Sequence, residues 1–365
     1  MTAVRNLARV NGLDTIRLAL AMLVVFGHLG FVVSLPDPES LAFPLNYSVA
    51  VFNNSLNGPA AVVCFFVVSG FCIHYPYRNG KELTLVPYFA KRHIRIWIPI
   101  GVVVAGAAWI NVKMNILGDS VLWSLIAEEI YYLIYPVIRR VNKPSSWAKM
   151  IGFAYLISLI LVATKPFAQN YPSFGLTGNW IVGFPCWLCG CLLAQNFDRF
   201  SAVGRHPSIS KMLVWRAGML LVGCVTSICR FHTPLGYPLT LTLASPLIYF
   251  WLRTEILFYL SRPPNPYLER LGMMTYSIYL AHVVSRYLWV EFWGSPPTAF
   301  WIRLLYFSWI AGTVTLFYVV AERPSHQLAR LCADWLTDRA RRNRPGPDVL
   351  SVSPAVDPCD RRRAA

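Results

Sequence analysis

Charged residues are scarce in this chain of 365 residues: Asp, Glu, Lys and Arg together make up 14%, whereas an ordinary soluble domain has about 25%. Hydrophobic residues make up 56% of the sequence. This composition excludes a disordered chain and disfavours a soluble enzyme. The aromatic content of 14% suits a protein with rings at two membrane interfaces. We therefore expect an all-α, polytopic integral membrane protein.

The cysteines do not form the pattern of a disulfide framework. Nine are present, an odd number, and most lie inside apolar runs, so we predict buried free thiols. The segment CWLCGC at 186–191 has a spacing seen in metal sites, but its apolar run has no nearby His or carboxylate. We therefore expect no metal there.

Long apolar runs occupy most of the chain. A helical span needs about 20 mostly apolar residues, which predicts about ten transmembrane helices. They are expected at residues 15–35, 58–75, 96–112, 120–138, 150–166, 179–195, 212–230, 236–252, 271–291 and 300–320.

The basic residues indicate the orientation of the chain. All but five of the 33 Lys and Arg residues lie on the side of the amino terminus, which predicts cytosolic N- and C-termini by the positive-inside rule. The exceptions are Lys113, Lys165, Arg230, Arg286 and Arg303. Membrane topology thus explains most of the net charge of +16, and nucleic acid is not expected as a partner.

The sequence changes character after Pro324, where it becomes polar and rich in Pro and Arg. Such a composition is typical of a solvated, disordered segment. We therefore predict a transmembrane domain over residues 1–324 and a basic, disordered cytosolic tail over residues 325–365.

Three ionisable residues are predicted near the middle of the membrane, where such groups are costly and commonly functional. At 1.5 Å per residue, His28 lies roughly 20 Å from the start of its helix, Glu128 roughly 12 Å and His282 roughly 17 Å. A single residue of this kind is explained as well by satisfied packing. Three at similar depth on separate helices favour a functional site.

Two pairs of residues extend this pattern toward the cytosol. Arg17 and His28 are 11 residues apart, a spacing that returns to nearly the same helix face after roughly 16 Å. Asp14 precedes Arg17 by three residues, so a simple helix-end ion pair is the alternative interpretation. Arg92 and Arg95 would share another helix face and could bind phosphates, or else anchor lipid headgroups.

Six segments resemble motifs of the membrane acyltransferase-3 family, whose signature is an Arg, ten residues and a His. Arg17 and His28 fit that spacing. The segments follow the family's order: LDTIRLALAMLVVFGH at 13–28, FFVVSGF at 65–71, KRHIRIWIP at 91–99, WSLIAEEIYYLIYP at 123–136, YSIYLAH at 276–282 and AERP at 321–324. Two departures occur: His93 stands where many relatives have a further Arg, and the segment 111–120 is short.

The resemblance implies a membrane O-acetyltransferase. Such an enzyme moves an acetyl or another acyl group from cytosolic acyl-coenzyme A to a hydroxyl of a carbohydrate, such as a surface polysaccharide, lipopolysaccharide or oligosaccharide. Acetyl-coenzyme A is then a donor substrate, and no permanently bound cofactor is expected. The resemblance also suggests a bacterial cytoplasmic (inner) membrane, with membrane lipids as further partners.

Catalytic roles are expected for His28 and Glu128. A neutral imidazole at His28 would act as a general base or as a transient acyl carrier. Glu128 would orient that imidazole or the acceptor, while Glu129 points about 100° away and is the lesser candidate.

Binding roles are expected for five further residues. Arg17, Arg92 and Arg95 would hold the coenzyme's phosphates. Ser69 and His282 would contact the substrate, although small residues such as Ser69 also serve to pack helices.

Two other classes use similar features. A multi-span transporter or flippase would relay protons through the same midplane groups, but it should show paired helix breaks in two repeated halves, and the sequence has no such repeat. A non-catalytic scaffold would tolerate the loss of both Arg17 and His28.

Overall fold

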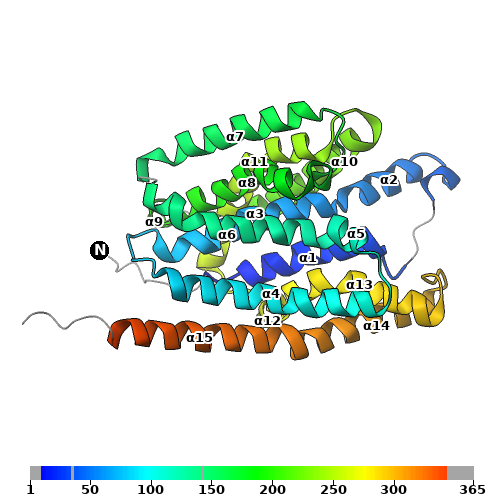
Figure 1. The fold of residues 1–365 in the computed structure, drawn as a ribbon. Helices are drawn as coiled ribbons and strands as arrows, with labels where there is room; N and C mark the ends of the chain where they lie inside the picture. Colours follow the sequence, from blue (N-terminus) through cyan, green and yellow to red (C-terminus); the bar gives the residue numbers. More distant parts are fainter. Residues whose placement is uncertain (1–9, 34–36, 142–143, 205, 343–365) are drawn as a thin grey trace, which may run out of the picture.

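The computed structural model describes residues 10–33, 37–141, 144–204 and 206–342, and every regular element within these ranges is a helix (Figure 1). The predicted all-α class is confirmed. Most helices run roughly along one axis, so the bundle has two ends. We call the end at which helix α1 begins the Asp14 end, and the opposite one the His28 end.

Within the described ranges, eleven long helices and several short ones build the bundle. The long helices are α1 (Leu13–Leu29), α3 (Gly58–His74), α4 (Leu85–Trp109), α6 (Trp123–Val141), α7 (Trp147–Thr164), α8 (Gly175–Gln195), α10 (Ile209–His232), α11 (Tyr237–Ser261), α13 (Thr275–Trp293), α14 (Phe300–Phe317) and α15 (Arg323–Arg342). The shorter ones are α2 (Leu45–Ser55), α5 (Met114–Leu117), α9 (Phe197–Ala202) and α12 (Pro266–Gly272). Two π-helical segments, Gly118–Leu122 and Tyr318–Glu322, precede α6 and α15.

Each of the ten predicted spans overlaps one long helix. In the part of the chain that the structure describes, six helical stretches are long and apolar enough to cross a membrane: Leu45–Tyr77, Met114–Val141, Trp147–Thr164, Tyr171–Gln195, Ile209–His232 and Phe300–Arg339. The remaining long helices α1, α4, α11 and α13 are not among these stretches, and α1 is the shortest of them, with 17 residues. The chain is therefore an integral membrane protein, and the number of ten spans stays a prediction.

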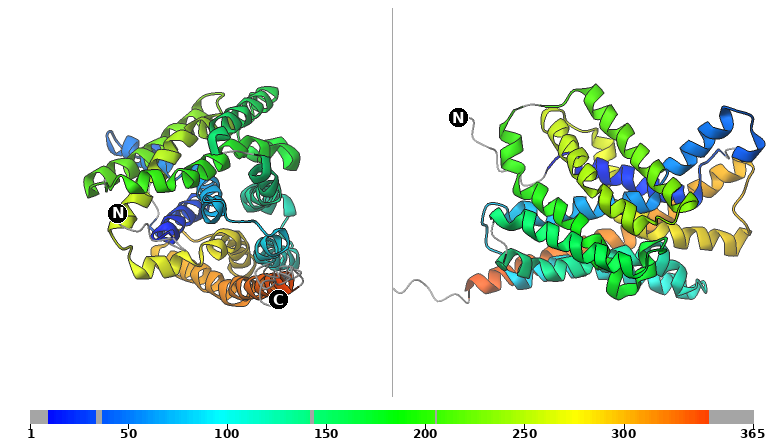
Figure 2. Two further views of the ribbon diagram at one scale, coloured as in Figure 1. Left: turned by 90° about the vertical axis from the view of Figure 1, so that its left-hand side faces the viewer. Right: turned by 90° about the horizontal axis from the view of Figure 1, so that it is seen from above.

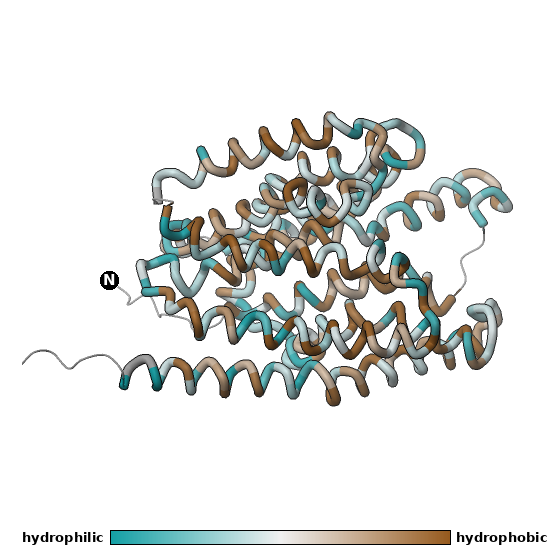
Figure 3. The backbone as a smooth tube through the Cα atoms, viewed as in Figure 1, coloured by the Kyte–Doolittle hydropathy of each residue, from teal (hydrophilic) through white to brown (hydrophobic). Residues whose placement is uncertain are grey.

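Large apolar side chains are exposed on the outer helices. On α7, Phe153, Leu156 and Ile160 are each more than half exposed, and Figure 3 shows apolar residues along this outer helix. Apolar surface of this extent is what a lipid-facing helix presents.

Helices α3 and α8 touch through their backbones near the centre of the bundle. A Cβ on Gly70 of α3 would lie 2.0 Å from the Trp187 carbonyl oxygen. One on Gly190 of α8 would lie 2.0 Å from the carbonyl oxygen of Val67. Small residues permit this close approach of helices, so Gly70 serves packing.

Helix α1 is fixed at its start by α12. Thr15 donates from its backbone N–H and from Oγ1 to Glu269 Oε1, over 2.9 and 2.8 Å. This carboxylate satisfies a donor that the first helical turn leaves unpaired, and it complements the helix dipole. Gly272 packs against the Asp14 backbone, where a Cβ would lie 2.2 Å from the carbonyl oxygen. Figure 2 (left) shows α1 surrounded by later helices.

The other end of α1 is fixed by two arginines. The helix ends at Leu29, earlier than the predicted residue 35, because Gly30 follows with a φ of +71° that breaks the helix. Arg286 donates to the His28 carbonyl oxygen over 3.4 Å, and Arg303 to that of Leu29 over 3.5 Å. Cations satisfy the unpaired carbonyls of a helix end, so both ends of α1 are held by other helices.

A disordered tail was predicted to begin at residue 325, but residues 325–342 form most of helix α15. It continues from α14 through the π-helical segment Tyr318–Glu322 and packs along α4. Ser325, Ala329 and Ala333 are buried at four-residue spacing, which gives α15 one narrow face of small residues. Polar residues cover much of its remaining surface, so composition alone indicated a solvated segment. Residues 343–365 of the predicted tail lie outside the described residues.

Gly190→Ala is expected to destabilise the bundle, because the added methyl group would meet the Val67 carbonyl oxygen and push α3 away from α8. We expect the free energy of unfolding to fall by about 2 kcal/mol. Gly312→Ala on α14, where an added Cβ has no neighbour within 4 Å, is the matched control. Thermal unfolding in detergent, followed by tryptophan fluorescence, compares both with the wild type. Equal midpoints for the two variants would contradict the packing described here.

Candidate active site

A cavity of about 490 Å³ lies between α1, α3, α4, α6, α13 and α15, in the half of the bundle toward the Asp14 end. We call it the arginine cavity. Five arginines and three carboxylates line it: Arg17, Arg92, Arg95, Arg323, Arg330, Asp14, Glu128 and Glu322. Positive charge therefore exceeds negative charge around this cavity.

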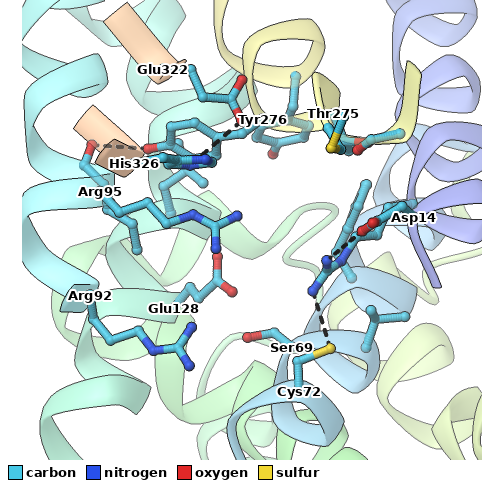
Figure 4. Close-up of a pocket in the computed structure, with 18 of the residues that line it drawn as sticks. Asp14, Ser69, Cys72, Arg92, Arg95, Glu128, Thr275, Tyr276, Glu322 and His326 are labelled. Carbon is cyan, nitrogen blue, oxygen red and sulfur yellow. Dashed lines mark hydrogen bonds and ion pairs between the residues drawn. The ribbon is translucent and has the colours of Figure 1, made fainter. Parts of the chain in front are cut away.

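The arginines differ in their contacts. Arg17 pairs with Asp14 at 3.0 Å and also donates to Cys72 Sγ over 3.1 Å, so the helix-end ion pair forms while Arg17 still lines the cavity. Arg92 and Arg95 reach into the cavity from α4 (Figure 4). Within the described residues, neither has a hydrogen-bond or ion-pair partner. Two guanidinium groups in this position can bind an anion.

Three hydrogen-bonded side chains join α3 to α6 on the cavity wall. Tyr132 Oη donates to Glu128 Oε1. Since the tyrosine hydroxyl has one proton, Ser69 Oγ donates to Tyr132 Oη over 3.1 Å. The predicted site residues Ser69 and Glu128 therefore lie in one network, and all three side chains line the arginine cavity.

Glu129 does not line this cavity. Its side chain is buried, and Oε2 lies 2.5 Å from His93 Nδ1. This pair connects α6 to α4, and it gives the histidine in the basic segment 91–99 a partner inside the protein.

A second cavity, of about 750 Å³, lies toward the His28 end. We call it the asparagine cavity. Four asparagines and four aromatic residues line it: Asn53, Asn54, Asn57, Asn170, Trp123, Tyr171, Phe231 and Tyr237. Asp119 also lines it, from the π-helical segment Gly118–Leu122. The other π-helical segment borders the arginine cavity through Tyr318 and Glu322, and such segments are frequent at functional sites.

His28 lines the asparagine cavity and forms a pair with His282. His28 Nδ1 lies 2.8 Å from His282 Nε2, and the ring centroids are 5.1 Å apart. His282 Nδ1 lies 2.9 Å from the Ile278 carbonyl oxygen, which can only accept, so Nδ1 carries a proton. In the neutral pair, His282 Nε2 accepts from His28 Nδ1, and His28 Nε2 keeps its lone pair.

The two histidines have different surroundings. His282 is fully buried and lines neither cavity, although it was expected to contact a substrate. Its partners are His28 and the backbone of its own helix. The arrangement fixes the tautomer of His28, as the third residue of a catalytic triad does for its histidine.

The two cavities approach each other at α3 and α6. Val62 lines both of them, while Trp123 lines the asparagine cavity and its neighbour Ser124 lines the arginine cavity. Arg17 and His28 lie on one face of α1, but they line two different cavities and not two parts of the same cavity.

The predicted site residues that line a cavity are distributed over the two cavities. Arg17, Arg92, Arg95, Ser69 and Glu128 line the arginine cavity. His28 lines the asparagine cavity, so the structure does not bring Glu128 and His28 together.

Sequence reasoning missed the wall that α15 contributes to the arginine cavity. Arg323, His326, Gln327 and Arg330 line it, at a spacing that places four residues on one helix face. The preceding Glu322 is 1% exposed and accepts two hydrogen bonds from the first turn of α13. The helical spacing was a usable signal, but the polar composition had indicated a solvated tail.

Within the described part of the chain, no group of three or more His, Cys, Asp or Glu side chains is placed to hold a metal ion. Cys186, Cys189 and Cys191 of the segment CWLCGC are buried free thiols.

Comparison with known proteins then gives a family match. A family model described as an acyltransferase domain, Acyl_transf_3, matches residues 10–322. The match begins before α1 and ends at Glu322. No curated protein and no solved structure matches the chain.

The tautomer of His28 can be measured directly. We expect the neutral ring to be protonated at Nδ1 and unprotonated at Nε2, because His282 accepts from Nδ1. Solid-state NMR of ¹⁵N-histidine-labelled protein in lipid would show this, with the His28 signals assigned by their loss in His28→Gln. A neutral His28 protonated at Nε2 would contradict the hydrogen-bond pattern.

Proposed function

The chain belongs to the acyltransferase-3 family, and from this premise we propose that it is a membrane O-acyltransferase. It transfers an acetyl or another acyl group from acyl-coenzyme A to a hydroxyl of a carbohydrate, such as a surface polysaccharide, lipopolysaccharide or oligosaccharide. The observation that carries the proposal is the pair of cavities meeting at Val62, one rich in arginines and the other in asparagines and aromatic rings.

The arginine cavity suits the phosphates of coenzyme A. Guanidinium groups bind phosphates through parallel N–H bonds. Arg92 lies over the Tyr132 ring at 5.7 Å, but neither Arg92 nor Arg95 has a hydrogen-bond or ion-pair partner among the described residues. Arg17 adds a third positive charge, although Asp14 offsets it. A volume of about 490 Å³ lies within the usual range of small-molecule sites. Acyl-coenzyme A is a substrate in this proposal, and no resident cofactor is invoked.

The asparagine cavity suits a carbohydrate acceptor. Side-chain amides both donate and accept hydrogen bonds, as sugar hydroxyls do, and aromatic rings can pack against the apolar faces of sugar rings. Asn54, Asn170, Trp123 and Tyr171 line the cavity near His28. His28 is thus reached from the side where the acceptor is proposed to bind.

The orientation follows from the basic residues. We place the Asp14 end in the cytosol, where acyl-coenzyme A is available, because most Lys and Arg residues are expected on that side. The asparagine cavity then faces the opposite side of the membrane. Ten spans and a bacterial cytoplasmic membrane complete the proposal.

His28 performs the central step in this proposal. Nε2 takes the proton of the acceptor hydroxyl while its oxygen bonds to the carbonyl carbon of the thioester. The carbon–sulfur bond then breaks, and the proton passes from His28 to the departing thiolate of coenzyme A. If His28 acts as an acyl carrier, the same Nε2 first takes the acyl group and then releases it to the acceptor.

Glu128 is proposed to act on the donor side. It accepts from Tyr132, which in turn accepts from Ser69, so its charge holds both hydroxyl groups in place on the wall of the arginine cavity. We therefore assign Glu128 the positioning of the donor and not that of the His28 ring.

Replacement of His28 by Ala is expected to reduce acyl transfer by about 100- to 10 000-fold, the range of a lost general base. Membranes that contain wild type or variant receive radiolabelled acetyl-coenzyme A, and label is followed into glycan and lipid fractions. His232→Ala is the matched control, because His232 is exposed at the end of α10 and lines neither cavity.

Undiminished transfer by a folded His28→Ala protein would remove His28 from the mechanism. Label that stays on wild-type protein when acceptor is absent, and not on His28→Ala, would identify His28 as an acyl carrier.

Val62→Trp is expected to separate the two cavities, because a larger side chain would fill the place where they meet. Transfer should fall by about 100-fold, as it does when reacting groups cannot approach, while the KM for acetyl-coenzyme A stays near that of the wild type. Val62→Ala leaves the passage open and should transfer normally. Full transfer by Val62→Trp would show that the acyl group takes another route.

A further inference from the structure

Helix α15 begins where the family match ends. The matched residues are 10–322, and α15 spans Arg323–Arg342. It nevertheless lines the arginine cavity together with helices inside the matched region. The segment beyond the shared domain therefore completes the cavity in this chain.

The packing of α15 sets which of its residues face the cavity. α15 lies along α4, and its small residues Ser325, Ala329 and Ala333 are buried. A different face, which includes Arg323 and Arg330, lines the cavity. Seven residues separate these two arginines, so they share one stripe and lie about 10 Å apart along the helix.

The two arginines on this stripe are not neutralised. Within the described residues, neither Arg323 nor Arg330 has a hydrogen-bond or ion-pair partner, and both are exposed. Lys91 on α4 is close enough to interact electrostatically with both Asp334 and Arg330 of α15. Asp334 makes no hydrogen bond or ion pair with Arg330 within the described residues, so the Arg330 guanidinium stays available to an anion.

The position of Arg330 fits the outermost phosphate of the donor. α15 runs from Glu322 toward the Asp14 end, so Arg330 lies farther out than Arg323. Coenzyme A carries a diphosphate next to its pantetheine arm and a separate 3′-phosphate on the ribose beyond it. With the thioester toward Val62, the 3′-phosphate is the phosphate group nearest the cytosol.

We propose that Arg330 binds the 3′-phosphate of the donor, so that α15 makes the enzyme selective for coenzyme A over dephospho-coenzyme A. This inference rests on the proposed function, since it assigns one group of the same donor to one residue. Arg17, Arg92 and Arg95 then serve the diphosphate, and Arg323 lies between the two phosphate positions. An anionic lipid headgroup carries similar phosphate chemistry and is the competing source of the anion.

Direct binding tests the inference without knowledge of the acceptor. Isothermal titration calorimetry on the full chain in neutral detergent, with no phospholipid added, gives the Kd of coenzyme A and of dephospho-coenzyme A. Wild type is expected to bind coenzyme A at least about tenfold more tightly, the effect of one charge-assisted contact. Arg330→Gln should lose this preference by weakening coenzyme A alone, and Arg330→Lys, which keeps the charge but not the fork, should retain part of it.

Arg339→Gln is the matched control. Arg339 is another exposed arginine of α15, and nine residues place it on the face opposite Arg330. This variant should bind both ligands as the wild type does.

Two results would overturn the inference while leaving the proposed function intact: equal affinity of the wild type for both ligands, or equal weakening of both by Arg330→Gln. Equal affinity of the wild type for both ligands, together with binding to anionic lipid vesicles that Arg330→Gln loses, would assign Arg330 to a headgroup. Absence of binding of either ligand to folded wild type would reject the proposed donor and the inference with it.

Discussion

A charged group inside a bundle in a membrane needs either a partner or a water-filled cavity, because hydrocarbon solvates no charge. This constraint explains four of the five basic residues that break the positive-inside pattern. Arg286 and Arg303 bind the last carbonyls of α1, Lys165 binds the Ser173 carbonyl oxygen over 2.8 Å, and Arg230 lies over the Phe231 ring. Arg286, Arg303 and Lys165 thus serve the fold, and Arg230 also lines the asparagine cavity. The arginine cavity is lined instead by four arginines that have no hydrogen-bond or ion-pair partner among the described residues, Arg92, Arg95, Arg323 and Arg330, which distinguishes a binding site from a set of packing contacts.

The same constraint makes α1 the axis of the site. Glu269 accepts from a backbone N–H at the start of this helix, and two arginines donate to carbonyls at its end, so each terminus has backbone groups paired by another helix. A helix held at both ends cannot slide along its axis without breaking these bonds. Arg17 and His28 are therefore kept at fixed depths, one on each cavity. Their spacing of 11 residues therefore sets the distance along α1 between Arg17 on the arginine cavity and His28 on the asparagine cavity.

Local patterns in the sequence predicted the parts of this arrangement that depend on neighbouring residues. The helices, the Arg17 to His28 stripe and the placement of Arg92 and Arg95 on one cavity all follow from helical periodicity. The pairing of His28 with His282 spans 254 residues and depends on how α1 and α13 pack, which no local pattern specifies. For the same reason the sequence indicated one midplane site where the structure has two cavities. For α15, the polar and charged composition led to a prediction of disorder. The four-residue spacing of Ser325, Ala329 and Ala333 in the sequence instead indicates a helix.

The separation of the cavities has a physical use in the proposed reaction. Coenzyme A carries several negative charges, and the cost of moving them through the bundle keeps the coenzyme on the arginine side. The acetyl thioester at the end of the pantetheine arm is small and uncharged, so it can reach past Val62 to His28 at far lower cost. A continuous open passage would let ions cross the membrane and water reach the thioester. A narrow apolar contact between two polar cavities therefore admits the thioester while it keeps the charged part of the donor, water and ions on their own sides.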